Sequence, residues 1–231
     1  MKLNNIRAVI FDLDDTLLNR RQMFGGWACD FIKSRTDLPN DTALYITSEL
    51  LRFERRGSTP RDEVFSYFER RLSDFGAHVA TDEMVKSYRD DYRRYSVLFD
   101  DAAKTLTALR ERGFRLGIIT NGYSLLQGQK IKTVGLSDYV DEIIISEDAG
   151  IRKPHPDIFR LCASRLGCDV SECVYVGDYV AWDIEGPLSA GMNAVFYRRN
   201  IFEDEYCDYQ PAIDRLYEIT ELLDKAGKER L

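Results

Sequence analysis

The feature that most constrains the fold is a short apolar run that ends in acidic residues. Residues 8–11 are all apolar, and Asp12, Asp14 and Asp15 follow within four positions. An apolar run this short, without polar alternation, is typical of a strand buried on both faces of a parallel sheet. In an extended chain Asp12 and Asp14 point the same way, so they repel each other unless a divalent cation or a shared proton lies between them. A strand end followed by an Asp-Thr helix cap is the alternative interpretation of these residues alone.

The composition is that of a globular protein rather than of a nucleic-acid or membrane binder. The 231 residues suffice for one large domain, or for a core domain with a smaller companion. The net charge is -7, whereas a protein that binds nucleic acid or an anionic membrane is expected to have a basic face. The chain starts without an apolar run long enough for a signal peptide or a membrane span. We therefore expect a cytoplasmic protein with no nucleic-acid partner and no membrane partner.

The cysteines do not indicate a metal site. They form neither a CxxC pair nor an even set, and we expect buried thiols in a reduced compartment rather than zinc ligands. The five positions are Cys29, Cys162, Cys168, Cys173 and Cys207.

The hydrophobic pattern divides the chain into two parts. Only helical periodicities occur over residues 20–95, which predicts an all-helical insert. Strand and helix patterns then alternate, as in α/β folds, with strands expected at residues 115–120, 142–146, 172–176 and 194–197. The helices of this part are expected at residues 101–112, 124–134, 156–166 and 214–225. The sequence thus predicts an α/β core domain with a parallel sheet over residues 1–19 and 97–231, and an all-helical domain inserted after the first strand, over residues 20–96.

Residues capable of chemistry gather just past the carboxyl ends of four expected strands. In an open parallel sheet this edge is where ligands bind. The set combines carboxylates for a cation, a hydroxyl or amide donor and one lysine, which suits an oxyanion with several oxygens, such as phosphate. Its members are Asp12, Asp14 and Asp15, then Thr120 and Asn121, then Lys153, then Asp178 and Asp183.

The order and spacing of these residues resemble the four motifs of the haloacid dehalogenase (HAD) superfamily. The resemblance covers nearly the whole chain and implies a Rossmann-like (HAD-like) core of three layers with a parallel sheet. The helical insert looks like the C1-type cap of that superfamily. The residues that carry the resemblance are Asp12-Leu13-Asp14-Asp15-Thr16, Thr120, Lys153-Pro154 and Gly177-Asp178, with Asp183 five residues further on.

The resemblance implies a catalytic role for three residues. Asp12 corresponds to the nucleophile that forms an aspartyl-phosphate. Asp14 corresponds to the general acid for the leaving alcohol and then the base for the incoming water. Members that remove halogens lack this second aspartate, so the chain resembles the phosphatase branch. Lys153 corresponds to the cation that neutralises the charge shared by Asp12 and the phosphoryl group.

The resemblance also implies a Mg²⁺ site and a phosphate-binding loop. The metal site would consist of the Asp12 side chain, the Asp14 backbone carbonyl and Asp178. Asp183 would hold a metal-bound water or orient Lys153. Phosphate oxygens would be held by Thr120 and by the amides of Asn121 and Gly122.

The local sequence narrows the expected substrate to a small phosphorylated metabolite. Residues 117–123, 136–139 and 145–150 are similar to the pyrimidine 5′-nucleotidase branch and are also compatible with sugar-phosphate and acylneuraminate-phosphate phosphatases. We expect a magnesium-dependent phosphatase acting on a nucleoside 5′-monophosphate or a sugar phosphate through an aspartyl-phosphate. The sequence leaves the oligomeric state open.

Three alternatives share part of this pattern. A phosphomutase would have every motif and differ in the chemistry of its cap. A two-component receiver domain also combines aspartates, a threonine and a lysine on an α/β sheet, but it is about half as long and has no helical insert. A non-catalytic protein that senses phosphate or binds a partner on this fold is the third.

The helical insert is expected to set substrate choice as a mobile lid. Its hinges are expected near residues 18–21 and 96–100. Candidates for substrate contact are the arginines before a turn at Gly57, weighed against a solvated arginine face, and two aromatic residues near the first hinge, weighed against the core of the insert. These candidates are Arg52, Arg55, Arg56, Phe24 and Trp27.

Overall fold

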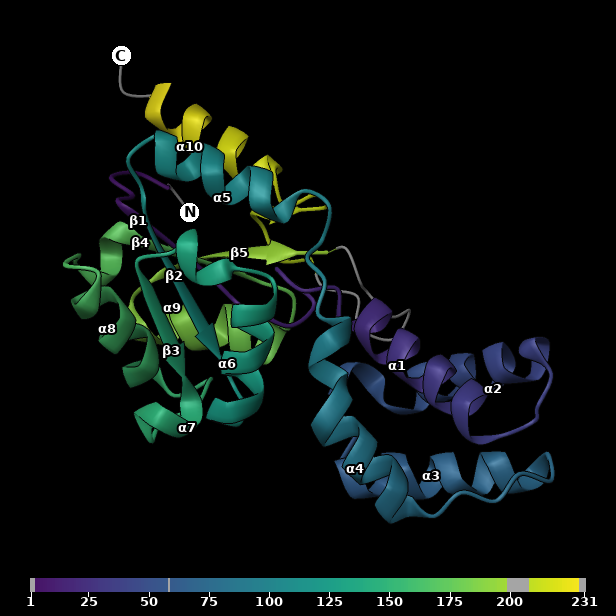
Figure 1. Ribbon diagram of the computed structural model, residues 1–231. Helices are drawn as coiled ribbons and strands as arrows, with labels where there is room; N and C mark the ends of the chain where they lie inside the picture. Colours follow the sequence, from purple (N-terminus) through teal and green to yellow (C-terminus); the bar gives the residue numbers. More distant parts are fainter. Residues whose placement is uncertain (1–2, 58, 199–207, 229–231) are drawn as a thin grey trace. The chain divides into compact units, whose positions relative to one another are not determined.

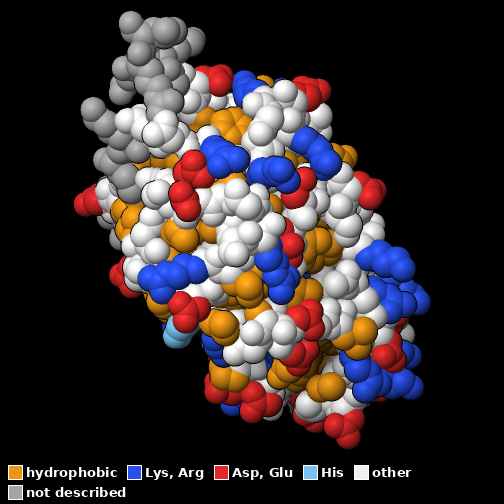
Figure 2. All heavy atoms as spheres, turned by 90° about the vertical axis from the view of Figure 1, so that its left-hand side faces the viewer, with side chains coloured by type: hydrophobic (Ala, Val, Ile, Leu, Met, Phe, Trp, Pro, Cys, Tyr) orange, Lys and Arg blue, Asp and Glu red, His pale blue; other side chains and the backbone are white. Residues whose placement is uncertain are grey.

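The computed structural model describes residues 3–57, 59–198 and 208–228 (Figure 1). Two positions considered above, Cys207 and the side chain of Arg56, lie outside the described part. The chain forms two compact units, which we call the α/β unit (Met1–Leu18 with Leu98–Leu231) and the helical unit (Asn19–Val97). In the described ranges, no helix is both long and apolar enough to cross a bilayer. Figure 2 shows acidic and basic side chains interspersed over one face of the molecule.

A parallel sheet forms the centre of the α/β unit. Its strands are β1 (Ala8–Phe11), β2 (Arg115–Thr120), β3 (Glu142–Ile145), β4 (Cys173–Gly177), β5 (Asn193–Tyr197) and β6 (Ala212–Ile213). They lie in the order β3-β2-β1-β4-β5-β6, and each neighbouring pair is parallel. All four residues of β1 are fully buried. The prediction of a first strand buried on both faces is therefore confirmed, and this strand lies between β2 and β4.

Helices cover both faces of this sheet (Figure 1). They are α5 (Ala102–Glu111), α6 (Ser124–Thr133), α7 (Ser146–Ala149), α8 (Pro156–Arg165), α9 (Gly186–Ala190) and α10 (Glu218–Lys228). On one face α8 packs on the sheet through a cluster that includes Ile10, Phe159 and Tyr175. On the other face α5 and α10 lie side by side. The predicted three-layer α/β fold with a parallel sheet is confirmed.

The carboxyl-terminal part differs from the sequence-based expectation in two places. Strand β6 pairs with β5 at the edge of the sheet and was not predicted, because two residues are too few to show a periodic pattern. Helix α10 begins at Glu218 rather than near residue 214. The Glu218 carboxylate accepts bonds from the backbone N–H groups of Asp214 and Arg215, so these two residues form a turn before the helix.

Aromatic side chains form the core of the helical unit. Its helices are α1 (Arg20–Arg35), α2 (Asn40–Phe53), α3 (Arg61–Asp74) and α4 (Thr81–Asp91). The Trp27 ring lies 6.1 Å from the ring of Phe68 and 5.2 Å from that of Tyr88. Phe24 packs beside Trp27, and the two side chains are 0% and 1% exposed. Of the two interpretations weighed for Phe24 and Trp27, substrate contact and the core of the insert, the structure supports the core, because both side chains fill the interior of this unit.

A buried ion pair also stabilises the helical unit. Arg20 Nη2 lies 2.6 Å from Glu54 Oε2, and both side chains are almost fully buried. Gly57, with φ +84°, lies against this pair, and a Cβ atom there would be 2.8 Å from the guanidinium carbon of Arg20. Gly76 has a similar φ of +78°, but no atom lies within 4 Å of its Cβ position. Glycine is therefore required at position 57 both for the left-handed backbone conformation and for space beside Arg20, whereas position 76 requires it only for the backbone conformation.

Replacing these two glycines by alanine separates the two requirements. We expect Gly76→Ala to lower the free energy of unfolding by about 1 kcal/mol, the cost of a left-handed conformation for a residue with a Cβ. Gly57→Ala should cost at least about 2 kcal/mol more, because the new methyl group displaces a buried charged pair. Urea unfolding followed by far-UV circular dichroism measures both. Equal losses would contradict the role assigned to Gly57.

Candidate active site

The loop after β1 returns on itself at the carboxyl edge of the sheet. The backbone N–H of Asp12 donates to Val176 O at 2.9 Å, so Asp12 is still tied to strand β4. Beyond it, the N–H of Leu18 donates to Leu13 O at 2.8 Å, and the N–H of Asp15 donates to Leu18 O at 2.8 Å. Asp15 has φ +65°, which lets the chain turn sharply. The closed loop fixes the backbone that carries Asp12 and Asp14.

Lys153 lies at the centre of the site. Its Nζ atom is 2.5 Å from Asp12 Oδ1, 2.7 Å from Asp183 Oδ1 and 2.9 Å from the Tyr175 hydroxyl oxygen. The lysine side chain is only 2% exposed. An ammonium group has three N–H donors, and these three oxygens satisfy all of them. The structure therefore brings the predicted residues Asp12, Lys153 and Asp183 into direct contact.

Asp183 is held by backbone groups as well as by the lysine. Its Oδ2 accepts from the N–H groups of Asp178 and Tyr179, at 3.2 and 3.0 Å. It belongs to a π-helical turn, Val180–Glu185, which follows the end of β4. A Cβ at Gly177 would lie 2.5 Å from the Asp183 side chain, so only glycine permits this close approach. Asp183 thus contacts Lys153 directly, and its expected role in orienting that lysine stays a prediction.

The carboxylates around Lys153 form a cluster that fits a divalent cation. Asp12, Asp178 and Asp183 each place one oxygen within 4.8 Å of the others, and all three are buried. Thr16 Oγ1 donates to Asp178 Oδ1 at 3.4 Å. Carboxylate oxygens are the protein ligands that Mg²⁺ prefers, and two of these three carboxylates, those of Asp12 and Asp183, contact the ammonium group of Lys153. Three of the four residues predicted to hold magnesium therefore have their carboxylates together in space, whereas the carboxylate of Asp14, which is expected to bind through its backbone carbonyl, is not part of this cluster.

Burial and the neighbouring charges shift the pKa values of the residues in this cluster. Burial raises the pKa of Asp12 to about 7, and repulsion from Asp183 adds to this rise, whereas attraction from Lys153 opposes it. For Lys153 itself, burial lowers the pKa, but attraction from Asp12 and Asp183 outweighs it and leaves the pKa above its usual value. Burial also raises the pKa of Tyr175 well above its usual value. The Tyr175 hydroxyl stays protonated and donates to Ile119 O at 3.0 Å.

The residues after β2, predicted to bind phosphate, have varied partners. Thr120 is buried, and its hydroxyl oxygen accepts from Gln127 Nε2 at 2.5 Å. The Asn121 side chain donates to Lys153 O at 3.0 Å and accepts from Lys153 N at 2.9 Å, so it anchors the lysine backbone. The N–H of Gly122 donates to Ser146 Oγ at 3.0 Å. The Thr120 hydroxyl keeps a hydrogen of its own to donate, and the expected phosphate contacts of all three residues stay predictions.

Two polar residues of α6 belong to the site although the sequence did not single them out. Lys130 Nζ lies 2.9 Å from Asp14 Oδ1 and 2.8 Å from Oδ2, and Gln127 Nε2 lies 3.0 Å from Asp14 Oδ2. Tyr175 was also missed, because it looks like an apolar residue of a buried strand. The spacing of Gln127 and Lys130 by three positions, just after the Thr120 loop, was a signal for both. It was missed because both resemble ordinary solvated residues of a helix.

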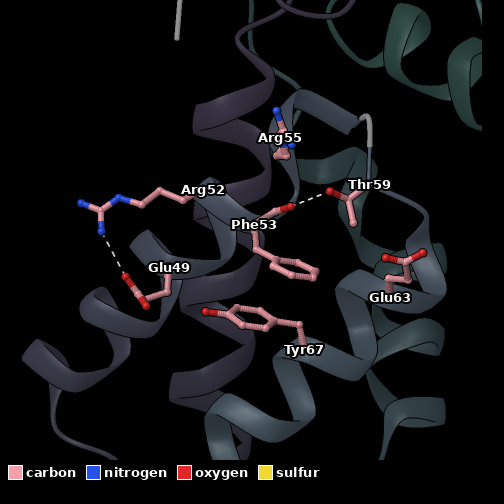
Figure 3. Close-up of a pocket in the computed structure, with 7 residues that line it drawn as sticks. All are labelled: Glu49, Arg52, Phe53, Arg55, Thr59, Glu63 and Tyr67. Atoms are coloured by element: carbon pink, nitrogen blue, oxygen red, sulfur yellow. Dashed lines mark hydrogen bonds and ion pairs between the residues drawn. The ribbon is translucent and has the colours of Figure 1, made fainter. Parts of the chain in front are cut away.

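A hollow on the helical unit contains two of the arginine candidates (Figure 3). Its volume is about 520 Å³, and the residues that line it are Glu49, Arg52, Phe53, Arg55, Thr59, Glu63 and Tyr67. The rings of Phe53 and Tyr67 stack at 4.1 Å, and Arg52 Nη1 lies 3.0 Å from Glu49 Oε1. A role for Arg52 and Arg55 in substrate contact stays a prediction.

The fold and the site together define a class of α/β proteins that carry an aspartate and lysine centre at the carboxyl edge of a parallel sheet. A family model described as haloacid dehalogenase-like hydrolase matches residues 6–191, which is most of the chain. The chain therefore belongs to the haloacid dehalogenase-like hydrolases, and the predicted family is confirmed.

Relatives of this chain include two phosphatases and a solved hydrolase. The glyceraldehyde 3-phosphate phosphatase of Methanopyrus kandleri is 32% identical over 237 residues, covering 97% of this chain and 100% of the relative. The ribulose-1,5-bisphosphate 5-phosphatase of Halopiger xanaduensis is 31% identical over 200 residues, covering 82% and 84%. The structure of the HAD-hydrolase YfnB from Bacillus subtilis, bound to magnesium, matches with a TM-score of 0.69 at 25% identity, covering 95% of this chain and 99% of that one.

These comparisons confirm the predicted enzyme class, a phosphoric monoester hydrolase. They exclude the two-component receiver domain, which belongs to a different family and has no helical insert. The narrower resemblance to pyrimidine 5′-nucleotidases stays a prediction, as do the roles of individual residues and the function of the helical unit as a cap.

The raised pKa of Asp12 predicts how the stability of the metal-free protein depends on pH. In the unfolded chain this pKa is near its usual value of 3.8, and in the folded protein it is about 7, so the folded state binds the proton more tightly. The stabilisation from Asp12 is therefore complete below about pH 4 and is lost as the pH rises through about 7. In EDTA, we expect the wild-type protein to lose about 2 kcal/mol relative to Asp12→Asn between about pH 5 and pH 8.

Unfolding by urea at several pH values measures this difference, and added Mg²⁺ should reduce the loss above about pH 7 because a bound cation favours the ionised carboxylate. Parallel stability profiles for the wild type and Asp12→Asn would contradict the prediction.

Proposed function

We propose that this protein is a magnesium-dependent phosphatase that hydrolyses a small sugar phosphate through an aspartyl-phosphate on Asp12. The observation that carries the proposal is the contact of Lys153 with both Asp12 and Asp183, inside a buried cluster that includes Asp178. This arrangement neutralises part of the negative charge that a phosphate group would otherwise meet beside an ionised nucleophile.

The first half of the reaction transfers the phosphoryl group to Asp12. A carboxylate oxygen of Asp12 attacks phosphorus, and the bond from phosphorus to the ester oxygen breaks. The departing alkoxide takes a proton from Asp14, so an alcohol leaves. Lys153 stabilises the charge that Asp12 and the phosphoryl oxygens share, and the Thr120 hydroxyl donates to one of those oxygens.

The second half releases phosphate. A water oxygen attacks the same phosphorus, and its proton passes to Asp14. The bond between phosphorus and the Asp12 oxygen breaks, and its electron pair returns to the Asp12 carboxylate. Asp14 then carries the proton needed for the next substrate, so the cycle closes without any other reactant.

A Mg²⁺ ion would be held by the side chains of Asp12 and Asp178 and the backbone carbonyl of Asp14. When bound, it supplies positive charge that orients the phosphate and stabilises its oxygens. Asp183 supports this site by holding Lys153 and the backbone after β4. The magnesium in the solved relative from Bacillus subtilis supports the choice of metal.

The relatives favour a sugar phosphate as the substrate. The two phosphatases described above act on glyceraldehyde 3-phosphate and on ribulose 1,5-bisphosphate, as their names state. Both are small phosphate esters of an alcohol. A nucleoside 5′-monophosphate is the second candidate, because residues 117–123 resemble the pyrimidine 5′-nucleotidases.

Hydrolysis of p-nitrophenyl phosphate tests the mechanism. We expect activity with Mg²⁺, none with EDTA, and a loss of at least about 10³-fold in Asp12→Asn, because the nucleophile is removed. Asp157→Asn is the matched control, since Asp157 is an exposed aspartate of α8 that pairs with Arg160. Substantial turnover by Asp12→Asn, or turnover that survives EDTA, would overturn the mechanism.

A set of phosphate esters then tests the substrate class. We expect the highest kcat/KM with a sugar phosphate of three to five carbons, and lower values with nucleoside 5′-monophosphates. Released phosphate is measured by a colorimetric assay, and the organic product by mass spectrometry. An isomer of the substrate without free phosphate would identify a phosphomutase instead, and the absence of turnover with every ester would favour a phosphate-sensing protein.

A further inference from the structure

Two side chains of helix α6 bind the carboxylate of Asp14. Lys130 of α6 contacts both Asp14 oxygens, at 2.9 and 2.8 Å, and is itself only 6% exposed. Gln127, one turn earlier on the same helix, donates to Asp14 Oδ2 at 3.0 Å. A carboxylate bound on both oxygens by a buried cation, and on one of them also by an amide, has little freedom to rotate.

The same helix connects Asp14 to the loop expected to bind phosphate. The side-chain amide of Gln127 also donates to the hydroxyl oxygen of Thr120, at 2.5 Å. Because that oxygen accepts the amide hydrogen, the hydroxyl's own hydrogen can point to another acceptor, such as a phosphate oxygen. The two α6 residues thus act differently: Gln127 bridges Thr120 and Asp14, whereas Lys130 places its charge directly on the two oxygens of Asp14.

The contacts of Lys130 match one of the two states that Asp14 must adopt. An ammonium group can only donate, so both Asp14 oxygens act as acceptors here. A carboxyl group that carries a proton would have a donor at one oxygen and would lose one of these contacts. The observed arrangement is therefore that of a proton acceptor.

We propose that Lys130 is a positioning residue for the second half of the reaction. It holds Asp14 as an acceptor, so that Asp14 takes the proton of the water that attacks the phosphoryl group on Asp12. In that step the water oxygen bonds to phosphorus, the bond between phosphorus and the Asp12 oxygen breaks, and its electron pair stays on Asp12. This inference rests on the proposed function and adds to it a residue that acts through Asp14 without touching the substrate.

Substitution of Lys130 should therefore slow hydrolysis of the aspartyl-phosphate more than its formation. With p-nitrophenyl phosphate the leaving group departs with little help from an acid, so kcat/KM reports the transfer to Asp12. For Lys130→Met we expect kcat to fall about 10-fold or more and KM to fall with it. The value of kcat/KM should stay within about 3-fold of the wild type, and a burst of about one p-nitrophenolate per enzyme should precede slow turnover.

Two further measurements separate this role from a structural one. Mass spectrometry of acid-quenched protein should show the mass of one phosphoryl group on a larger fraction of Lys130→Met than of the wild type during turnover. Lys132→Met makes the same change at an exposed lysine of the same helix and should leave all constants unchanged. Lys130→Arg keeps a cation opposite Asp14 and should restore at least about a third of the wild-type kcat.

The outcomes are distinct. A fall in kcat/KM as large as the fall in kcat, with unchanged KM and no accumulated phosphorylated protein, overturns the role of Lys130 while the proposed function stands. Lys130→Gln, a second neutral variant, gives the same comparison if Lys130→Met does not fold. Failure of the proposed function is visible in the wild type, as absent turnover or as turnover that Asp12→Asn retains, and the inference then falls with it.

Discussion

The interaction on which the site depends is the contact of one buried ammonium group with two carboxylates. Lys153 lies between Asp12, which follows strand β1, and Asp183, in the turn after β4, and Lys153 and Asp12 are 141 positions apart in the chain. Without this cation, three buried carboxylates within 4.8 Å of one another could not all stay ionised, because repulsion and burial would favour protonation. The lysine thus makes an acidic cluster compatible with a folded sheet.

Two residues of strand β4 allow this cluster to lie at the edge of the sheet. The Tyr175 hydroxyl accepts from Lys153 and donates to Ile119 O, so an aromatic residue of the apolar core supplies the third oxygen that the ammonium needs. Gly177 ends β4 without a side chain, which allows Asp183 to approach the strand. These adaptations are small, but each satisfies a polar group that would be costly to leave buried without a partner.

How much the sequence could predict depended on the kind of signal each part carries. Strand β1 and a functional role for Asp12 could be predicted from the sequence, because a buried strand seldom ends in several carboxylates unless they bind a cation or take part in a reaction. The place of Lys130 in the site could not be predicted, because the helical pattern does not indicate which polar side chain is buried. For Phe24 and Trp27 the sequence left both substrate contact and the core of the insert open, because closeness to a hinge in sequence does not reveal the aromatic cluster that encloses them. Contacts between distant segments decided each of these cases.

All the groups that carry the proposed chemistry belong to the α/β unit, from Asp12 and Asp14 to Lys130, Lys153 and Asp183. The bond-breaking steps as proposed therefore use no side chain of the helical unit. Two relatives with different named substrates are nearly equally similar to this chain, at 32% and 31% identity. Overall similarity thus identifies the reaction but not the ester. The choice among phosphate esters must depend on residues outside the cluster, because a cluster that handles only the phosphoryl group does not distinguish one alcohol from another.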